Sequence, residues 1–411
     1  MRAEIITIGD ELLIGQVVDT NSAWMAERLN EQGIELYQIT SVHDDRDHII
    51  AALNEAFSRV DIVLTTGGLG PTKDDITKSV LCDYFGTHLI EDQRVHAHIL
   101  ELYQDRPDVL NRLTATQWLV PETATILTNR VGSAPIMAFQ RGNQLLVSMP
   151  GVPYEMQIAM TEQVLPYLQS QIINHQSPIL HRTMQVSGIP ESSLAILLES
   201  FENTKPAALH LAYLPKDGII RLRLSSYGQL TETDMQAYFD QLKTLVADYL
   251  IADTDEPLEV LVGRILQARH QTVATAESCT GGKIAELLNR HPGSSAFYYG
   301  SVIAYDNSVK QHMLDVPEEL IKKHGVVSEE VVRVMAQSVR TKLNTDFGIA
   351  TSGIAGPTGG SPDKPVGTVW IAWATPDSTY AECFHLGKLR DQITSRATLK
   401  SLIGLLKILN T

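Results

Sequence analysis

The apolar positions of the first 170 residues fall in short runs, separated by stretches with helical spacing. The runs predict strands at 4–8, 34–42, 61–66, 135–140 and 145–149. Helices are predicted over 19–29 and 45–57 and after Pro153. Such alternation indicates a largely parallel sheet covered on both faces, with ligands bound at the carboxyl ends of its strands.

Residues 180–250 follow a different order. Strands are predicted at 181–187, 209–214 and 219–225, and helices at 191–201 and 232–250. This β-α-β-β-α block is small, and we expect it to act as a spacer or a dimer contact.

From Pro257 the alternation of strands and helices returns. The predicted strands are 272–276, 297–305, 346–351, 366–374 and 380–386, and the predicted helices are 257–269, 281–289, one on each side of Ser328, and 391–409. The predicted fold class is therefore α/β. Two three-layer α/β domains, residues 1–168 and 255–411, are joined by a small α+β domain, residues 169–254.

Composition narrows the class of protein. The three cysteines, Cys82, Cys279 and Cys383, are too few and too far apart for a disulfide framework, which fits a reducing compartment. The chain has no uncharged apolar stretch of about 18 residues and no apolar leader at its start. We expect a soluble, cytoplasmic protein without a membrane partner.

The net charge of −15 is uneven along the chain. Residues 1–165 carry 23 acidic and 11 basic residues, a net −12, whereas 166–254 carry −3 and 255–411 carry 0. No clustered basic face is evident, so direct binding to nucleic acid is not expected. An acidic first domain that handles phosphates would need a cation.

The most informative run is Glu277-Ser278-Cys279-Thr280-Gly281-Gly282, which follows a predicted strand and precedes a predicted helix. A hydroxyl in such a turn lies near the backbone N–H groups at the positive end of the helix, where an oxyanion is stabilised. Ser278 is then either a nucleophile or a helix cap whose glycines only close the turn. Cys279 is the rival nucleophile, but no histidine lies near it in sequence, and we prefer Ser278.

Two further runs carry candidate chemistry. Tyr305 ends a predicted strand, and Lys310 lies on the helix that follows. A desolvated lysine loses enough basicity to act as a base toward a serine, and Tyr305 would relay the proton or orient the amine. The alternative is a packed aromatic beside a solvated lysine. The run 351–368 is rich in glycine and small hydroxyls, as in loops that approach a phosphate, or is only a flexible loop.

These three runs together resemble the C-terminal domain of the CinA family, competence/damage-inducible proteins that include bacterial nicotinamide mononucleotide (NMN) amidohydrolases. The resemblance covers about 258–411 and implies Ser278 as nucleophile, Lys310 as general base and Tyr305 as its partner, with no cofactor. The implied reaction converts NMN to nicotinic acid mononucleotide and ammonia through an acyl-enzyme. The implied substrate-binding residues are Thr280, Gly281 and Gly282 for the oxyanion, Gly353, Ala355, Gly356, Gly359 and Gly360, and either Arg390 or Arg396 for the phosphate.

A second glycine-rich run follows the strand at 61–66. The residues expected to wrap a phosphate or a pterin are Thr66, Gly67, Gly68, Gly70, Pro71 and Thr72. Asp74 and Asp75, with Asp44, are candidates to hold a divalent cation. The alternative for Asp74 and Asp75 is that they only favour the start of a helix.

With Gly9-Asp10-Glu11-Leu12-Leu13 and Asp19-Thr20-Asn21, this run is similar to the molybdopterin-binding fold of the MoaB and MogA proteins, as found at the N-terminus of CinA proteins. The similarity covers about 1–165 and implies a nucleotide or pterin pocket. Some relatives cleave the pyrophosphate of ADP-ribose with a divalent metal and potassium. The middle block resembles the KH-like insert of full-length CinA proteins, but it has no Gly-X-X-Gly loop, so RNA binding is not expected.

Three functional hypotheses follow. The first is an NMN amidohydrolase joined to an ADP-ribose pyrophosphatase-like domain, so that the partners are pyridine nucleotides. The second is a nucleotide-sensing partner in competence or the DNA-damage response that binds without turnover. The third gives the first domain a molybdopterin-related role. A homodimer is expected in each case.

Overall fold

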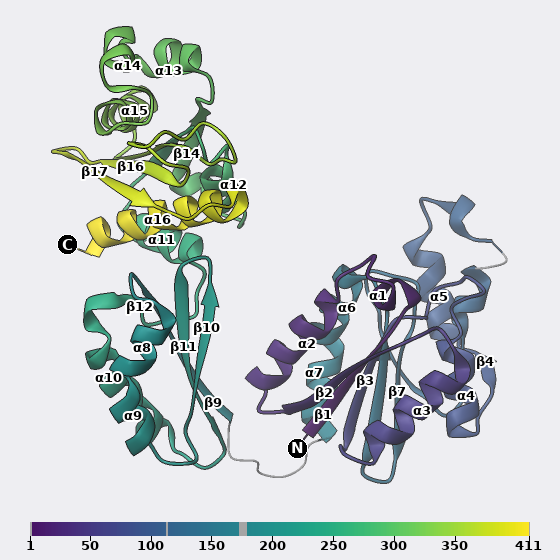
Figure 1. The fold of residues 1–411 in the computed structure, drawn as a ribbon. Coiled ribbons are helices and arrows are strands. Elements are labelled where there is room, and N and C mark those ends of the chain that lie inside the picture. Colours follow the sequence, from purple (N-terminus) through teal and green to yellow (C-terminus); the bar gives the residue numbers. More distant parts are fainter. Residues whose placement is uncertain (1, 112–113, 172–178, 411) are drawn as a thin grey trace. The chain divides into compact units, whose positions relative to one another are not determined.

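A computed structural model describes residues 2–111, 114–171 and 179–410 (Figure 1). The chain divides into two compact units. The first holds the described residues up to Leu180 together with Ser225–Glu232, and the second holds His181–Leu224 and the described residues from Thr233 onward.

The first unit is built on a six-stranded sheet of order β2-β1-β3-β8-β7-β6. Its strands are β1 (Arg2–Ile8), β2 (Glu35–Val42), β3 (Ile62–Thr66), β6 (Thr125–Leu127), β7 (Ile136–Arg141) and β8 (Gln144–Met149). The first four strands of that order are parallel, and β7 and β6 are antiparallel to their neighbours. A separate pair, β4 (Leu89–Glu91) and β5 (Leu119–Pro121), lies beside α5 (Gln93–Leu102) and was not predicted.

Consecutive residues of β1 show why this sheet has helices on both faces. Ile5 belongs to the core that includes Met25 of α2 (Thr20–Glu31), whereas Ile6 belongs to the core that includes Ile49 of α3 (Arg46–Phe57). Helices α6 (Pro153–Ala159) and α7 (Leu165–Gln171) join the first layer, and α4 (Thr77–Phe85) joins the second (Figure 1). Side chains of a strand alternate between faces, so the predicted three layers are confirmed.

The middle block forms a four-stranded sheet of order β10-β11-β9-β12. Its elements are β9 (Ile179–Ser187), α8 (Glu191–Leu197), α9 (Glu199–Thr204), β10 (His210–Lys216), β11 (Ile219–Tyr227), α10 (Glu232–Leu245) and β12 (Leu250–Ala252). The helix predicted to reach Leu250 is therefore wrong at its end. Leu250 instead pairs with Val186 of β9, because an open sheet edge offers hydrogen bonds that helical spacing does not reveal.

The last part of the chain forms a five-stranded sheet of order β14-β13-β15-β16-β17. The strands are β13 (Val273–Glu277), β14 (Tyr298–Ile303), β15 (Phe347–Gly353), β16 (Thr368–Ala374) and β17 (Thr379–His385). Val273 packs in the core with α11 (Leu258–Ala268), α12 (Lys283–Asn289) and α16 (Arg390–Asn410). Ala274 packs in the opposite core with α13 (Asn307–Leu314) and α15 (Glu329–Lys342), while the short α14 (Glu318–His324) lies beside α15.

Ile219 and Ala252 of the middle block share the hydrophobic core of the last sheet, which is why these two parts form one unit. The boundaries expected at 168 and 254 stay predictions. Among the described helices, none is both long and apolar enough to cross a membrane.

Candidate functional site

The register of the last sheet brings the three informative runs together. Glu277, the last residue of β13, lies opposite Ile303 of β14 and Thr351 of β15. Because these three strands are parallel, the segments that leave them meet at one edge of the sheet. A cavity of about 180 Å³ lies there, lined by Ser278, Cys279, Tyr305, Asn307, Lys310, Val326, Val327, Ser352, Gly353, Ala355 and Arg390. Six of the predicted site residues are in that set.

Lys310 is one of the most deeply buried side chains of the chain, only 1% exposed. Its Nζ donates hydrogen bonds to the carbonyl oxygens of Ala304 at 2.7 Å and Tyr305 at 2.9 Å. Burial lowers the pKa of Lys310 from its usual value, against the opposing effect of Asp306. The alternative of a solvated surface lysine is therefore excluded, and the amine is neutral more readily than an exposed one.

Ser278 is buried, and its backbone N–H donates to the carbonyl oxygen of Thr351 at 3.1 Å. It does not cap α12, whose N-cap residue is Gly282. Burial raises the pKa of the neighbouring Cys279 thiol to about 12. A thiol with its pKa raised in this way stays protonated near neutral pH, which favours Ser278 over Cys279 as the nucleophile.

The prediction for Tyr305 needs correction. Its side chain is 64% exposed, and the contact with Lys310 comes from its backbone carbonyl. No contact among the described residues gives its hydroxyl a hydrogen-bond partner. The contact between Tyr305 and the amine is therefore made by the backbone carbonyl and not by the phenol.

Thr280, Gly281 and Gly282, the predicted oxyanion site, are not among the residues that line the cavity. The Gly281 N–H donates to the Ser278 carbonyl at 3.2 Å, and the Gly282 N–H donates to Glu277 Oε2 at 2.9 Å. The Thr280 hydroxyl also donates to Glu277 Oε2, at 2.7 Å. The N–H groups of Gly281 and Gly282 are therefore already paired within the protein.

The glycine-rich loop after β15 contributes less than predicted. Gly353 and Ala355 line the cavity, but Gly356, Gly359 and Gly360 do not. A Cβ at Gly356 would lie 2.6 Å from Cγ1 of Val366, and a Cβ at Gly360 would lie 2.9 Å from its backbone nitrogen. These two glycines therefore let the loop pack against Val366, which is a different use of small residues from ligand binding.

The structure separates the two candidate arginines. Arg390 lines the cavity, and its Nη1 donates to the Gly356 carbonyl at 2.9 Å. Arg396 does not line the cavity, and its Nη1 donates to the Leu386 carbonyl at 3.0 Å. Of the two, Arg390 is placed to meet a ligand in this cavity.

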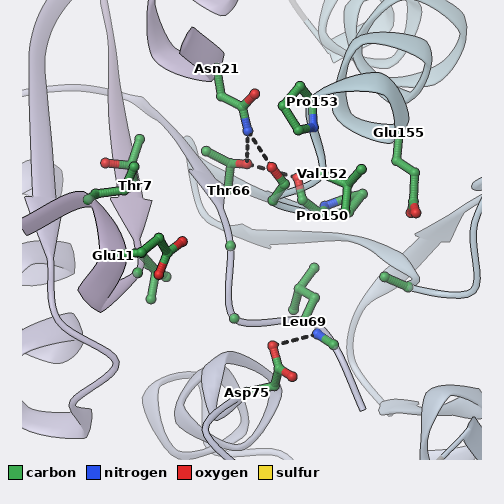
Figure 2. A pocket seen from close by; sticks show the side chains of 18 of the residues that line it. Thr7, Glu11, Asn21, Thr66, Leu69, Asp75, Pro150, Val152, Pro153 and Glu155 are labelled. Atoms are coloured by element: carbon green, nitrogen blue, oxygen red, sulfur yellow. Dashed lines mark hydrogen bonds between the residues drawn. The ribbon is translucent and has the colours of Figure 1, made fainter. Parts of the chain in front are cut away.

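A larger cavity of about 530 Å³ lies in the first unit, at the carboxyl ends of β1, β3 and β8 (Figure 2). The predicted residues that line it are Thr66, Gly67, Gly68, Gly70, Pro71, Asp44, Asp74 and Asp75. Thr72 does not line it. Its hydroxyl lies 2.5 Å from Asp74 Oδ1 and 2.5 Å from Asp75 Oδ2, and it donates its one hydrogen to either of them.

Hydrogen bonds hold the walls of this larger cavity together. Asn21 Nδ2 donates to Thr66 Oγ1 at 3.3 Å and to the Gly151 carbonyl at 2.7 Å, and Thr66 Oγ1 donates to the Pro150 carbonyl at 2.8 Å (Figure 2). Gly67 has a φ of +113°, and a Cβ there would lie 2.0 Å from the Ile8 carbonyl oxygen. Only glycine permits this approach of the loop to β1.

Comparison with known proteins agrees with both resemblances. The family model "CinA C-terminal domain" matches residues 255–409, and "Probable molybdopterin binding domain" matches residues 4–170. A CinA-like protein of Flavobacterium psychrophilum is 41% identical over 410 residues, which cover 98% of this chain and 97% of the relative. A CinA-like protein of Cytophaga hutchinsonii is 42% identical over 409 residues, covering 98% and 97%. The chain belongs to the CinA family.

This CinA chain also aligns with a crystal structure of the competence damage-inducible protein A from Klebsiella pneumoniae, at 34% identity and a TM-score of 0.37. The alignment covers 37% of the CinA chain and 95% of the Klebsiella chain. The CinA chain thus joins a molybdopterin-binding-like domain to a CinA C-terminal domain.

The carboxylates of the CinA N-terminal cavity were the candidates to hold a divalent metal. Asp75 accepts a hydrogen bond from the N–H of Gly70 at 2.7 Å (Figure 2). It also accepts one from the N–H of Thr72 at 2.9 Å, so each of its oxygens has a partner in the loop. Within residues 2–111, 114–171 and 179–410, no three His, Cys, Asp or Glu side chains are arranged to hold a metal ion. The divalent metal implied at Asp44, Asp74 and Asp75 therefore stays a prediction.

Four residues that line the C-terminal cavity were not predicted, namely Asn307, Val326, Val327 and Ser352, and neither was the role of Glu277 beside it. Asn307 lines the cavity, and its position two residues after Tyr305 is the sequence feature that could have identified it. In the sequence, nothing except its position before Ser278 indicates a role for Glu277. In the structure its carboxylate is fully buried. Burial of a charged side chain is the property that spacing along the chain reveals least.

Proposed function

We propose that the C-terminal domain hydrolyses NMN to nicotinic acid mononucleotide and ammonia, with Ser278 as nucleophile and Lys310 as general base. The observation that carries this proposal is the setting of the Lys310 amine. A neutral amine has two N–H donors, and the carbonyls of Ala304 and Tyr305 accept both. The lone pair is then free to accept a proton inside the cavity that Ser278 also lines.

The proton path follows from this arrangement. Lys310 Nζ takes the proton of Ser278 Oγ as the oxygen attacks the carboxamide carbon, and then gives it to the nitrogen as the C–N bond breaks and ammonia leaves. In the second half Lys310 takes a proton from water, the hydroxide attacks the ester, and the proton returns to Ser278 Oγ as the C–O bond breaks. None of the cavity's lining residues is His, Asp or Glu, so Lys310 is its candidate base.

The test is to incubate the full chain with NMN, separate the products by chromatography and measure the ammonia released. Equimolar ammonia and nicotinic acid mononucleotide are expected. If calorimetry shows tight NMN binding while no product forms, the protein is a nucleotide-sensing module and the hydrolase proposal is wrong.

Arg390 is expected to bind the phosphate of NMN. Replacing it with Ala should raise KM for NMN by about 10- to 100-fold with a smaller change in kcat, because a charge-assisted bond to an anion contributes mainly to binding. The matched control is Arg396→Ala, which removes an arginine of the same helix that does not line the cavity. Equal effects of the two variants on KM would contradict the assignment.

For the N-terminal domain, the cavity of about 530 Å³ beneath a glycine-rich loop supports binding of a nucleoside diphosphate such as ADP-ribose. Calorimetry with ADP-ribose and with pterin, each with and without Mg²⁺ and K⁺, tests this, and chromatography detects cleavage. Gly67→Ala should abolish binding. Gly142 also has a positive φ, +62°, but a Cβ there meets nothing within 4 Å and the residue does not line the cavity, so Gly142→Ala should not. Binding of pterin but not ADP-ribose would favour the molybdopterin-related role instead.

A further inference from the structure

Glu277 is a fully buried carboxylate directly before the proposed nucleophile. Its Oε2 accepts hydrogen bonds from the Thr280 hydroxyl at 2.7 Å, the Gly282 N–H at 2.9 Å and the Ile284 N–H at 3.2 Å. Its Oε1 accepts from the Thr275 hydroxyl at 3.2 Å and the Ala285 N–H at 2.8 Å. Burying a charge is unfavourable unless its hydrogen bonds are made, and here five donors meet one carboxylate.

The donors show that the Glu277 carboxylate holds the start of α12. Three of them are backbone N–H groups at the start of α12, whose N-cap residue Gly282 makes no side-chain capping bond. The first N–H groups of a helix have no partner within the helix. Glu277 supplies that partner from the end of β13. Its hydrogen bonds therefore link the end of the strand to the start of α12 and hold the turn between them in place. Ser278 is the first residue of that turn.

The backbone of Glu277 connects the same turn to Lys310. Its carbonyl oxygen accepts the Ala304 N–H at 2.7 Å, and the Ala304 carbonyl in turn accepts Lys310 Nζ at 2.7 Å. The positions of both Ser278 and Lys310 therefore depend on hydrogen bonds made by Glu277. Its side chain holds the turn, and its main chain holds the strand end that orients the amine.

We propose that Glu277 is a positioning residue that sets the distance between Ser278 and Lys310. This inference rests on the proposed roles of those two residues. It also explains why the N–H groups of Gly282, Ile284 and Ala285 are closed to substrate, since the carboxylate occupies them.

The experiment compares Glu277→Gln with wild type. Gln keeps the shape but offers one oxygen, so its NH₂ group meets N–H donors that the carboxylate had accepted. Amide hydrogen exchange at Gly282, Ile284 and Ala285 should become faster. Because a displacement of about 1 Å reduces catalysis by about 10²-fold, kcat for NMN should fall about 100-fold while KM changes little.

Two further variants and one reagent keep this test decisive. Glu286→Gln removes an exposed carboxylate of the same helix, paired with Arg290, and should leave kcat unchanged. Thr280→Val removes one of the five donors to the carboxylate. It replaces Glu277→Gln in the test if that variant does not fold, and a smaller fall in kcat is expected. A serine-directed fluorophosphonate, with Ser278→Ala as blank, reports the reactivity of Ser278 without NMN.

The outcomes separate the two proposals. Wild-type protein that reacts with the fluorophosphonate but not with NMN would reject the substrate, and Glu277→Gln should still slow that labelling. If the wild-type protein reacts with neither, Ser278 is not the nucleophile, and the proposal that Glu277 positions it is also wrong. Wild-type kcat and labelling in Glu277→Gln, despite faster amide exchange, would overturn the positioning role alone.

Discussion

Replacing Ser278 with Ala is expected to reduce ammonia release from NMN by at least about 10³-fold, because the variant has no oxygen to form the acyl-enzyme. The fold should remain, since the Ser278 contact with Thr351 is made by the backbone N–H, which alanine keeps. Circular dichroism and the melting temperature check the fold, and a coupled ammonia assay measures kcat.

The matched control is the neighbouring cysteine. Cys279→Ala removes a thiol that lines the same cavity but whose pKa burial raises to about 12, so it is protonated at the pH of the assay. Its kcat should remain within about threefold of wild type, consistent with the small effect of a residue outside the covalent step. The reverse pattern, with Ser278→Ala active and Cys279→Ala inactive, would reject the serine mechanism.

The second large effect is expected for Lys310→Met, which keeps the length of the side chain but removes the amine. Loss of a general base reduces rates by about 10²- to 10⁴-fold, so kcat should fall by that factor. Lys400→Met is the control, because burial also lowers the pKa of Lys400. The Lys400 Nζ donates to Ser187 Oγ, and Lys400 does not line the cavity. Unchanged kcat in Lys310→Met would exclude this base.

The pH dependence of wild type follows from the same lysine. A general base must be unprotonated, so kcat/KM should rise with pH up to the pKa of Lys310, which burial places below the usual value of about 10.4. Stability should rise with pH over the next interval, between the lowered pKa of the folded lysine and its usual value of about 10.4. The unfolded lysine still binds a proton there and the folded one does not, so the unfolded state binds more protons. Lys310→Met should lose both dependences.

The sequence by itself determined the α/β class and both three-layer folds, and it placed the candidate runs at the ends of strands. Apolar periodicity is local, and each chemical run follows directly after a strand, as Ser278 follows β13 and Tyr305 follows β14. The carboxyl ends of neighbouring parallel strands meet at one edge, so runs far apart in sequence could be expected in one place.

Only the tertiary structure decided which of these groups are free to act. Whether a donor is free depends on partners elsewhere in the fold, as when Glu277 takes the Gly282 N–H that was predicted to bind an oxyanion. The choice of Arg390 over Arg396 and the burial of Lys310 depend likewise on how helices pack against the sheet. Hydrogen-bond partners and desolvation are set by three-dimensional neighbours, and residue types and their spacing do not specify them.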